Sequence, residues 1–249
     1  MIEKKIVIMG ASSGIGLASA RILLRSGMKL GLAARRTEEL ARLADEFPGR
    51  VEYASIDICS PDAPAALYAL IDALGGMDIY FHVAGIGYDN PTLDPEHEAK
   101  IVNTNATAFA RMVSAAYKWM RDAGVRGQIA AVTSVAGTNG IGNMSAYSAS
   151  KKFAQTYLVA MRQLAFTDKS GVDFTDIRPG WTTTALLKEG KQYPLQMTLD
   201  HVVPLILSAI NHRRRVAVID WRWAIVVALW RLVPNCLWVR MGRATQTLV

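Results

Sequence analysis

The stretch KKIVIMGASSGIG, residues 4–16, decides how this chain folds. It opens with a short β-branched apolar run that predicts a strand, and this strand leads directly into Gly10, Gly14 and Gly16. Glycines let the backbone turn tightly and approach a ligand closely. The apolar stretch that follows predicts a helix, whose first amide groups and positive dipole end can bind a phosphate. A phosphate-binding loop is therefore expected here, and a plain tight turn is the alternative.

The same alternation continues outward from this stretch. Short β-branched runs are separated by longer amphipathic stretches, which predicts βαβ units and a parallel sheet covered on both faces. We therefore expect a single doubly wound Rossmann-type α/β domain over residues 1–220, with about seven strands. The apolar residues 221–249 are expected to form a helical tail of the same domain. The runs expected as strands after the first are 29–34, 51–56, 78–83, 128–133, 172–177 and 215–219.

Composition limits the classes of function. The 249 residues are 51% hydrophobic and 20% charged, which is typical of a globular protein. Cys59 and Cys236 have neither a second nearby cysteine nor a nearby histidine, so we expect no disulfide framework and no metal, and a cytoplasmic location. The formal net charge is +7, but the basic residues are dispersed apart from Arg213, Arg214 and Arg215. That triplet is interpreted as a solvated turn, and no nucleic-acid partner is expected.

The residues after the second expected strand indicate which dinucleotide binds. That strand ends at Ala34 and is followed by Arg35 and Arg36. An acidic residue near this point binds the ribose hydroxyls of NAD, whereas an arginine accommodates the additional phosphate of NADP. The planar guanidinium group suits a phosphate, so NADP(H) is predicted over NAD(H). The alternative is that both arginines simply begin a solvated helix.

The stretch SAYSASKKF, residues 145–153, places Tyr147 and Lys151 on one face of an expected helix. Taken by itself, this is either a surface pair or an acid with the cation that tunes it. Together with the other motifs in order, it resembles the short-chain dehydrogenase/reductase family over about residues 4–220. The matching residues are the Gly-x-x-x-Gly-x-Gly loop, Asp57 with Ile58, Ala84 with Gly85, Asn105, Ser134 thirteen residues before Tyr147, Tyr147-x-x-x-Lys151, Pro179 with Gly180, Thr182 and Thr184.

The chain also departs from the family pattern. Met9 replaces the usual threonine, Val83 the usual asparagine and Ala108 a common glycine. These positions mostly brace the backbone, so we expect local repacking. His82, at the end of an interior strand, is expected to be hydrogen-bonded within the fold rather than to act as a base.

The resemblance implies a hydride transfer between NADP(H) and a carbonyl or alcohol carbon. Tyr147 would act as general acid or base, because a lysine cation one turn away is expected to lower the tyrosine pKa. Ser134 would hydrogen-bond the substrate oxygen, and the resemblance implies that Lys151 also holds the ribose and that Asn105 holds a relay water. The alternative is a non-catalytic NADP(H)-binding sensor. The resemblance and the loop together assign to the cofactor Gly10, Ser12, Ser13, Gly14, Ile15, Gly16, Arg35, Arg36, Asp57, Ile58, Ala84, Gly85, Tyr147, Lys151, Pro179, Gly180, Thr182 and Thr184.

The substrate is predicted from apolar residues in the loops after the later strands. Ile141, Met144, Trp181 and Tyr193, together with Leu186–Leu187, indicate a mainly apolar pocket for a small ketone or alcohol. The alternative is that some of these side chains simply close the core.

The tail sequence WRWAIVVALWRLVPNCLWVRM, residues 221–241, contains three arginines and Pro234. These interruptions argue against a membrane-spanning helix and favour two short helices that break at the proline. Three settings stay open: a contact in a homo-oligomer (dimer or tetramer) near the substrate entrance, a peripheral membrane contact, or packing on its own domain. The subunit contact is slightly favoured.

Overall fold

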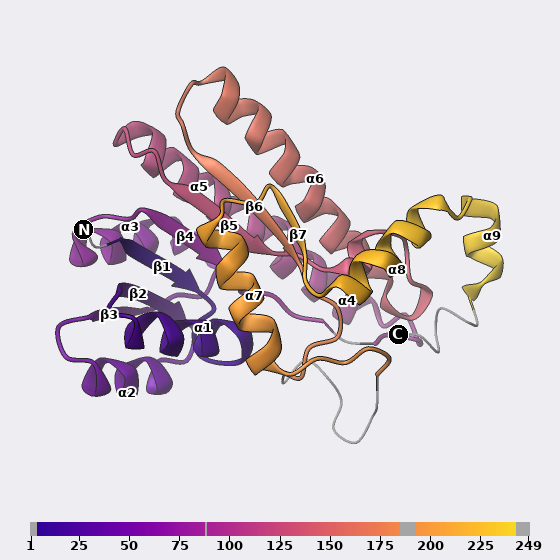
Figure 1. Ribbon diagram of the computed structural model, residues 1–249, viewed down its shortest axis with the longest axis horizontal. Helices are drawn as coiled ribbons and strands as arrows, with labels where there is room; N and C mark the ends of the chain where they lie inside the picture. Colours follow the sequence, from indigo (N-terminus) through magenta and orange to yellow (C-terminus); the bar gives the residue numbers. More distant parts are fainter. Residues whose placement is uncertain (1–3, 88, 185–192, 243–249) are drawn as a thin grey trace.

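The computed structural model describes residues 4–87, 89–184 and 193–242. Within these ranges seven parallel strands form one sheet in the order β3-β2-β1-β4-β5-β6-β7 (Figure 1). This confirms the predicted doubly wound architecture. The strands are β1 (Lys5–Met9), β2 (Lys29–Ala34), β3 (Val51–Ser55), β4 (Ile79–His82), β5 (Gln128–Val132), β6 (Asp173–Arg178) and β7 (Val216–Val218).

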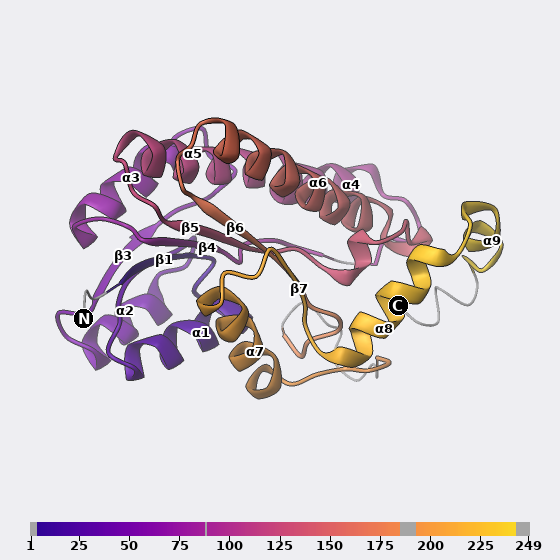
Figure 2. The same cartoon turned by 45° about the horizontal axis from the view of Figure 1, so that its top comes forward.

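Helices cover both faces of the sheet, and each layer buries its own apolar core (Figure 2). One layer holds α1 (Gly14–Arg25), α2 (Glu38–Glu46) and α7 (Leu199–Asn211). The other holds α3 (Ala63–Leu74), α5 (Phe109–Asp122) and α6 (Ser145–Thr167). A further helix, α4 (Pro95–Val102), continues into α5 through a π-helical segment, η1 (Asn103–Ala108).

The strand order reverses beside β1, which pairs with β2 on one edge and with β4 on the other. Ligands of doubly wound folds bind beyond the carboxyl ends of the strands at such a point. Gly10 turns the chain there with φ +97°, and a Cβ atom at this position would lie 2.6 Å from the backbone nitrogen of Ala84. The close approach of the loops after β1 and β4 therefore requires a glycine.

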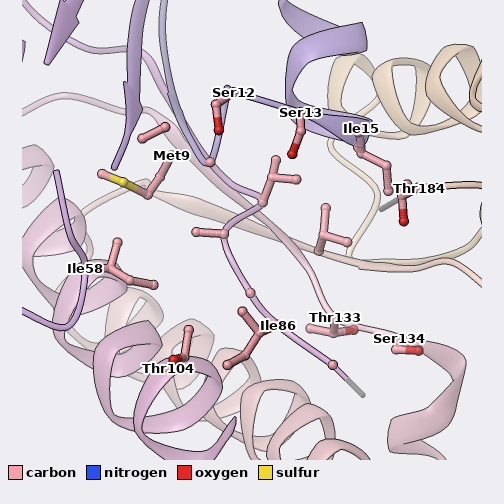
Figure 3. Close-up of a pocket in the computed structure, with 18 of the residues that line it drawn as sticks. Met9, Ser12, Ser13, Ile15, Ile58, Ile86, Thr104, Thr133, Ser134 and Thr184 are labelled. Atoms are coloured by element: carbon pink, nitrogen blue, oxygen red, sulfur yellow. The ribbon is translucent and has the colours of Figure 1, made fainter. Parts of the chain in front are cut away.

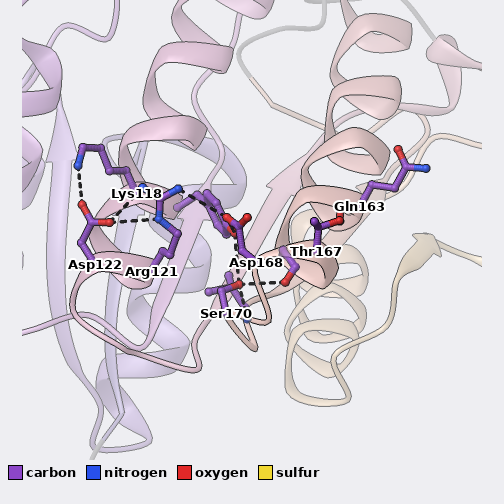
Figure 4. Close-up of polar contacts among 10 residues, drawn as sticks. Lys118, Arg121, Asp122, Gln163, Thr167, Asp168 and Ser170 are labelled. Carbon is purple, nitrogen blue, oxygen red and sulfur yellow. Dashed lines mark hydrogen bonds and ion pairs between the residues drawn. The ribbon is translucent and has the colours of Figure 1, made fainter.

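An exposed ionic cluster lies between the C-terminal ends of α5 and α6, near the amino ends of the strands that follow them (Figure 4). Asp122 pairs with Lys118 and Arg121, and Arg121 also pairs with Asp168, which accepts a hydrogen bond of 2.8 Å from Tyr117. Exposed ion pairs of this kind contribute little to stability, because water and salt screen them. The cluster connects two helix ends on the side of the domain away from the ligand crevice.

The tail forms two helices, α8 (Trp221–Leu232) and α9 (Asn235–Arg240), separated at Pro234 as predicted. Trp223 and Trp238 are buried, and their indole nitrogens donate hydrogen bonds to the carbonyls of Leu195 and Gly140. One face of the tail therefore packs on its own domain. No helix in the described ranges is both long and apolar enough to cross a bilayer.

Candidate active site

A cavity of about 720 Å³ lies across the carboxyl ends of the strands. Figure 3 shows Ser12, Ser13 and Ile15 of the glycine loop on one side of it, with Ile86 and Thr104 on the other. Most residues assigned to the cofactor or to catalysis line this single space. They are Gly10, Ser12, Ser13, Gly14, Ile15, Arg35, Arg36, Asp57, Ile58, Ala84, Gly85, Ser134, Tyr147, Lys151, Pro179, Gly180, Thr182 and Thr184.

The glycine loop has the shape that a diphosphate needs. Helix α1 starts at Gly14, directly after the extended Ser13, so its first amide groups point into the cavity end of the loop. Gly16 does not line the cavity; a Cβ atom there would lie 2.1 Å from the carbonyl oxygen of Gly10. Gly16 therefore lets α1 pack against the loop. The loop fits a dinucleotide phosphate group on these grounds.

The far end of the cavity is formed by residues that follow β2 and β3. Arg35 and Arg36 are exposed on its rim, and Ala34 brings no carboxylate. Asp57 and Ile58 lie beside them. Lys100 of α4 also lines the cavity, which the sequence did not indicate because nothing in its neighbourhood distinguishes it from a solvated helix lysine.

Ser134, Tyr147 and Lys151 meet at the other end. The Lys151 Nζ atom donates a 3.1 Å hydrogen bond to the carbonyl of Val132 and lies 5.7 Å from the centre of the Tyr147 ring. Ser134 is the second residue after β5, and its Oγ atom accepts a 3.1 Å hydrogen bond from the amide of Ala136. A proton donor and a cation thus face a common space at the end of β5.

The protonation of this group differs from the sequence expectation. Burial raises the pKa of Tyr147, and the hydrogen bond with Ser134 opposes that shift. The net shift is therefore upward and not downward as predicted, because spacing along a helix does not reveal how far the phenol is removed from water. Burial also lowers the pKa of Lys151 to about 8, against the carboxylate of Asp176, which raises it.

Asn105 lies in the π-helical segment, a geometry that is frequent at functional sites. Its side chain does not line the cavity; Oδ1 accepts from the amide of Ile86 at 2.9 Å and Nδ2 donates to the carbonyl of the same residue at 2.7 Å. Nδ2 also donates to Ser150 at 3.2 Å. In this structure Asn105 therefore braces the loop after β4 against α6.

Three supporting features were not predicted. The amide of Gln155 donates a 2.7 Å hydrogen bond to the carbonyl of Ser134. Asp176 and Arg178 form a buried ion pair under the site. A Cβ atom at Gly87 would lie 2.7 Å from two carbons of the Tyr147 ring. Asp176 inside the apolar run 172–177, with Arg178 directly after the run, was the one available signal for the ion pair.

The predicted substrate residues divide into two groups. Met144 and Trp181 line the cavity, whereas Ile141 and Tyr193 do not. Ile141 packs in a small buried cluster with Met144, and the Tyr193 ring contacts Trp181 in a tilted arrangement with the ring centroids 4.5 Å apart. Leu186 and Leu187 lie outside the described residues.

His82 is hydrogen-bonded within the fold, as expected. It is buried, and its Nδ1 atom is 2.9 Å from the hydroxyl of Tyr80. Burial and the neighbouring Lys151 lower its pKa to about 3, so the ring is neutral at ordinary pH.

A doubly wound sheet with a glycine loop, a cavity at its switch point and a Ser–Tyr–Lys group defines the class of dinucleotide-binding oxidoreductases. Residues 4–193 match the family model described as short chain dehydrogenase, and the chain belongs to this family. An oxidoreductase of Myxococcus xanthus is 30% identical over 244 residues, which cover 95% of each chain.

Solved structures show the same fold. A short chain dehydrogenase from Burkholderia cenocepacia, in complex with NADP, is 20% identical with a TM-score of 0.82 over 96% of this chain and 97% of that chain. A relative from Burkholderia phymatum, in complex with NAD, is 23% identical with a TM-score of 0.80 over 91% of this chain and 92% of that chain. One fold thus accommodates either dinucleotide.

Proposed function

We propose that this oxidoreductase transfers a hydride between NADP(H) and the carbonyl or alcohol carbon of a mainly apolar substrate. The observation that carries the proposal is the meeting of Ser134, Tyr147 and Lys151 on the wall of the cavity that also contains the glycine loop. The dinucleotide, when bound, supplies or accepts the hydride. The protein must then supply position and a proton.

Tyr147 is the proposed proton donor for reduction. Its raised pKa keeps the phenol protonated, which is the form that reduction needs. Lys151 places a positive charge beside the ring and stabilises the phenolate left after the proton moves. The hydroxyl of Ser134 is proposed to hydrogen-bond the substrate oxygen while negative charge develops there.

The preference for NADP(H) over NAD(H) rests on the cavity rim. Two guanidinium groups, Arg35 and Arg36, stand directly after β2, and Ala34 offers nothing to a 2′-hydroxyl. Arginine forms charge-assisted, bidentate hydrogen bonds with phosphate, so the 2′-phosphate of NADP is the ligand that this rim suits.

The apolar substrate is inferred from the residues at the Tyr147 end. Met144, Trp181 and Ile86 line the cavity there, and the Tyr193 ring packs against Trp181. An apolar wall with a few polar groups at one point is typical of small-molecule sites. We propose a small ketone or alcohol on this basis.

The assembly and location are part of the proposal. Helix α6 exposes Phe153, Val159 and Phe166, which supports a homo-oligomer through this helix. Both cysteines are free and exposed, which supports a reducing compartment and therefore a cytoplasmic location.

Tyr147→Phe tests the proposal. The variant should lose turnover with every ketone or alcohol that the wild type converts, followed by NADPH absorbance, because a general acid contributes about 10²–10⁴-fold. Its affinity for NADPH, measured by fluorescence titration, should stay near that of the wild type. Turnover at the wild-type rate would refute the role of Tyr147, and binding without turnover in the wild type would favour a sensor.

A further inference from the structure

The tail has two different faces. Trp223, Val227 and Trp230 point toward the domain and are buried or half-buried. The opposite face exposes four large apolar side chains at helical spacing in α8, and further ones in α9. They are Trp221 at 70%, Ile225 at 51%, Leu229 at 58%, Leu232 at 78%, Leu237 at 49% and Val239 at 71% exposure. We name this set the outer face of the tail. Large apolar side chains exposed along one helical face, as in α8, mark an interaction site.

The charged residues of the tail itself have one sign. Residues 221–249 contain four arginines and neither aspartate nor glutamate. Arg222 is bound to Asp220, whereas Arg231 and Arg240 are exposed. An apolar helix face with tryptophan, flanked by arginine and free of acids, is the pattern of helices that lie in the surface of an anionic membrane.

We propose that the outer face of α8 and α9 docks on the surface of a bilayer that contains anionic lipids. A second copy of the chain fits less well. The commonest dimers have twofold symmetry and use the same patch on both subunits, so such a dimer would bring the arginines of both tails together with no acidic tail residue to pair with them. Anionic headgroups complement these arginines, and each one near the surface strengthens binding by about fivefold.

The position of the tail suits this docking. Helices α8 and α9 extend beyond the sheet at the end away from α2 in both views (Figures 1 and 2). The indole nitrogens of Trp223 and Trp238 donate hydrogen bonds to the carbonyls of Leu195 and Gly140. These two residues lie in the loops that flank the Met144 and Trp181 end of the cavity. Docking therefore places this end near the bilayer, where apolar compounds concentrate, although the docking itself does not depend on turnover.

The test is flotation of the full chain with phosphatidylcholine vesicles, with and without phosphatidylglycerol. We expect the protein to float with the anionic vesicles and to be released in part by high salt. Ile225→Glu and Leu229→Glu should each lower the bound fraction by about tenfold or more, because a buried apolar side chain is replaced by a charge of the wrong sign. Ile22→Glu is the matched control, since Ile22 is an exposed apolar residue of α1, outside the tail, and the change should leave flotation unchanged.

A second variant keeps the apolar face intact. Arg231→Gln combined with Arg240→Gln should remove most of the preference for anionic vesicles, about fivefold for each arginine. Circular dichroism melts show that each variant is folded. No flotation of the wild-type chain with anionic vesicles, or equal flotation of Leu229→Glu, overturns the proposal. A dimer in light scattering that Leu229→Glu dissociates, without vesicle binding, assigns the outer face to a second copy and overturns it as well.

Discussion

Gly87→Ala should slow catalysis while leaving the fold and cofactor binding intact. The new Cβ atom would lie 2.7 Å from Cδ2 and Cε2 of Tyr147, about 0.7 Å closer than the 3.4 Å at which ordinary contact begins. The Tyr147 ring or the loop after β4 must therefore move by most of that distance. A misplacement of about 1 Å costs on the order of 10²-fold in rate, so we expect kcat to fall by about 10- to 100-fold, or roughly 1.4–2.7 kcal/mol.

The matched control is Gly140→Ala. A Cβ atom at Gly140 meets nothing within 4 Å, and neither glycine has the positive φ that would strain an alanine. The assay is NADPH oxidation with a converted ketone, combined with thermal melts and NADPH titration of both variants. A wild-type kcat for Gly87→Ala would show that contact with Gly87 does not position the Tyr147 ring. Equal losses in both variants would point to general loop disturbance instead.

Three further predictions concern the cofactor, the proton and the cation. Arg35→Ala should weaken NADPH binding by about tenfold or more and leave NADH binding unchanged, as measured by fluorescence titration, because a charge-assisted hydrogen bond is worth about 1.5–3 kcal/mol. The rate of ketone reduction should fall as pH rises through about 8, because Lys151 loses its proton there while Tyr147, with its raised pKa, still keeps its own. Asp176→Asn removes the carboxylate that raises the pKa of Lys151, so the fall in the pH–rate profile should move to lower pH; an unmoved profile would show that Asp176 does not set the pKa of Lys151.

Local chemistry explains why so much of the fold could be predicted. Gly10 needs a left-handed φ, and that requirement is set by the residue itself and by its place after a strand. Pro234 breaks the tail helix for an equally local reason, because it lacks the amide proton that a helix interior needs. Such features can be predicted from a sequence without any knowledge of distant contacts.

Features that depend on distant contacts could not be predicted. The pKa of Tyr147 depends on burial by loops far along the chain, so spacing to Lys151 indicated the wrong direction. In α8 both helical faces are apolar, and hydrophobic pattern alone cannot tell the buried Trp223 from the exposed Trp221. The same holds for Asn105, whose bonds to Ile86 cross nineteen residues of chain.

The contact between Gly180 and Trp223 joins the Pro179–Gly180 segment, which lines the cavity, to helix α8 of the tail. A Cβ atom at Gly180 would lie 2.1 Å from the indole ring, so the space beside the Pro179–Gly180 segment is already filled by the first turn of α8. Positions 180 and 223 should therefore vary as a pair among homologous chains. A bulkier residue at 180 requires a smaller one at 223. A chimera that carries the tail of a relative should therefore pack correctly only if its residue at 223 is compatible with Gly180.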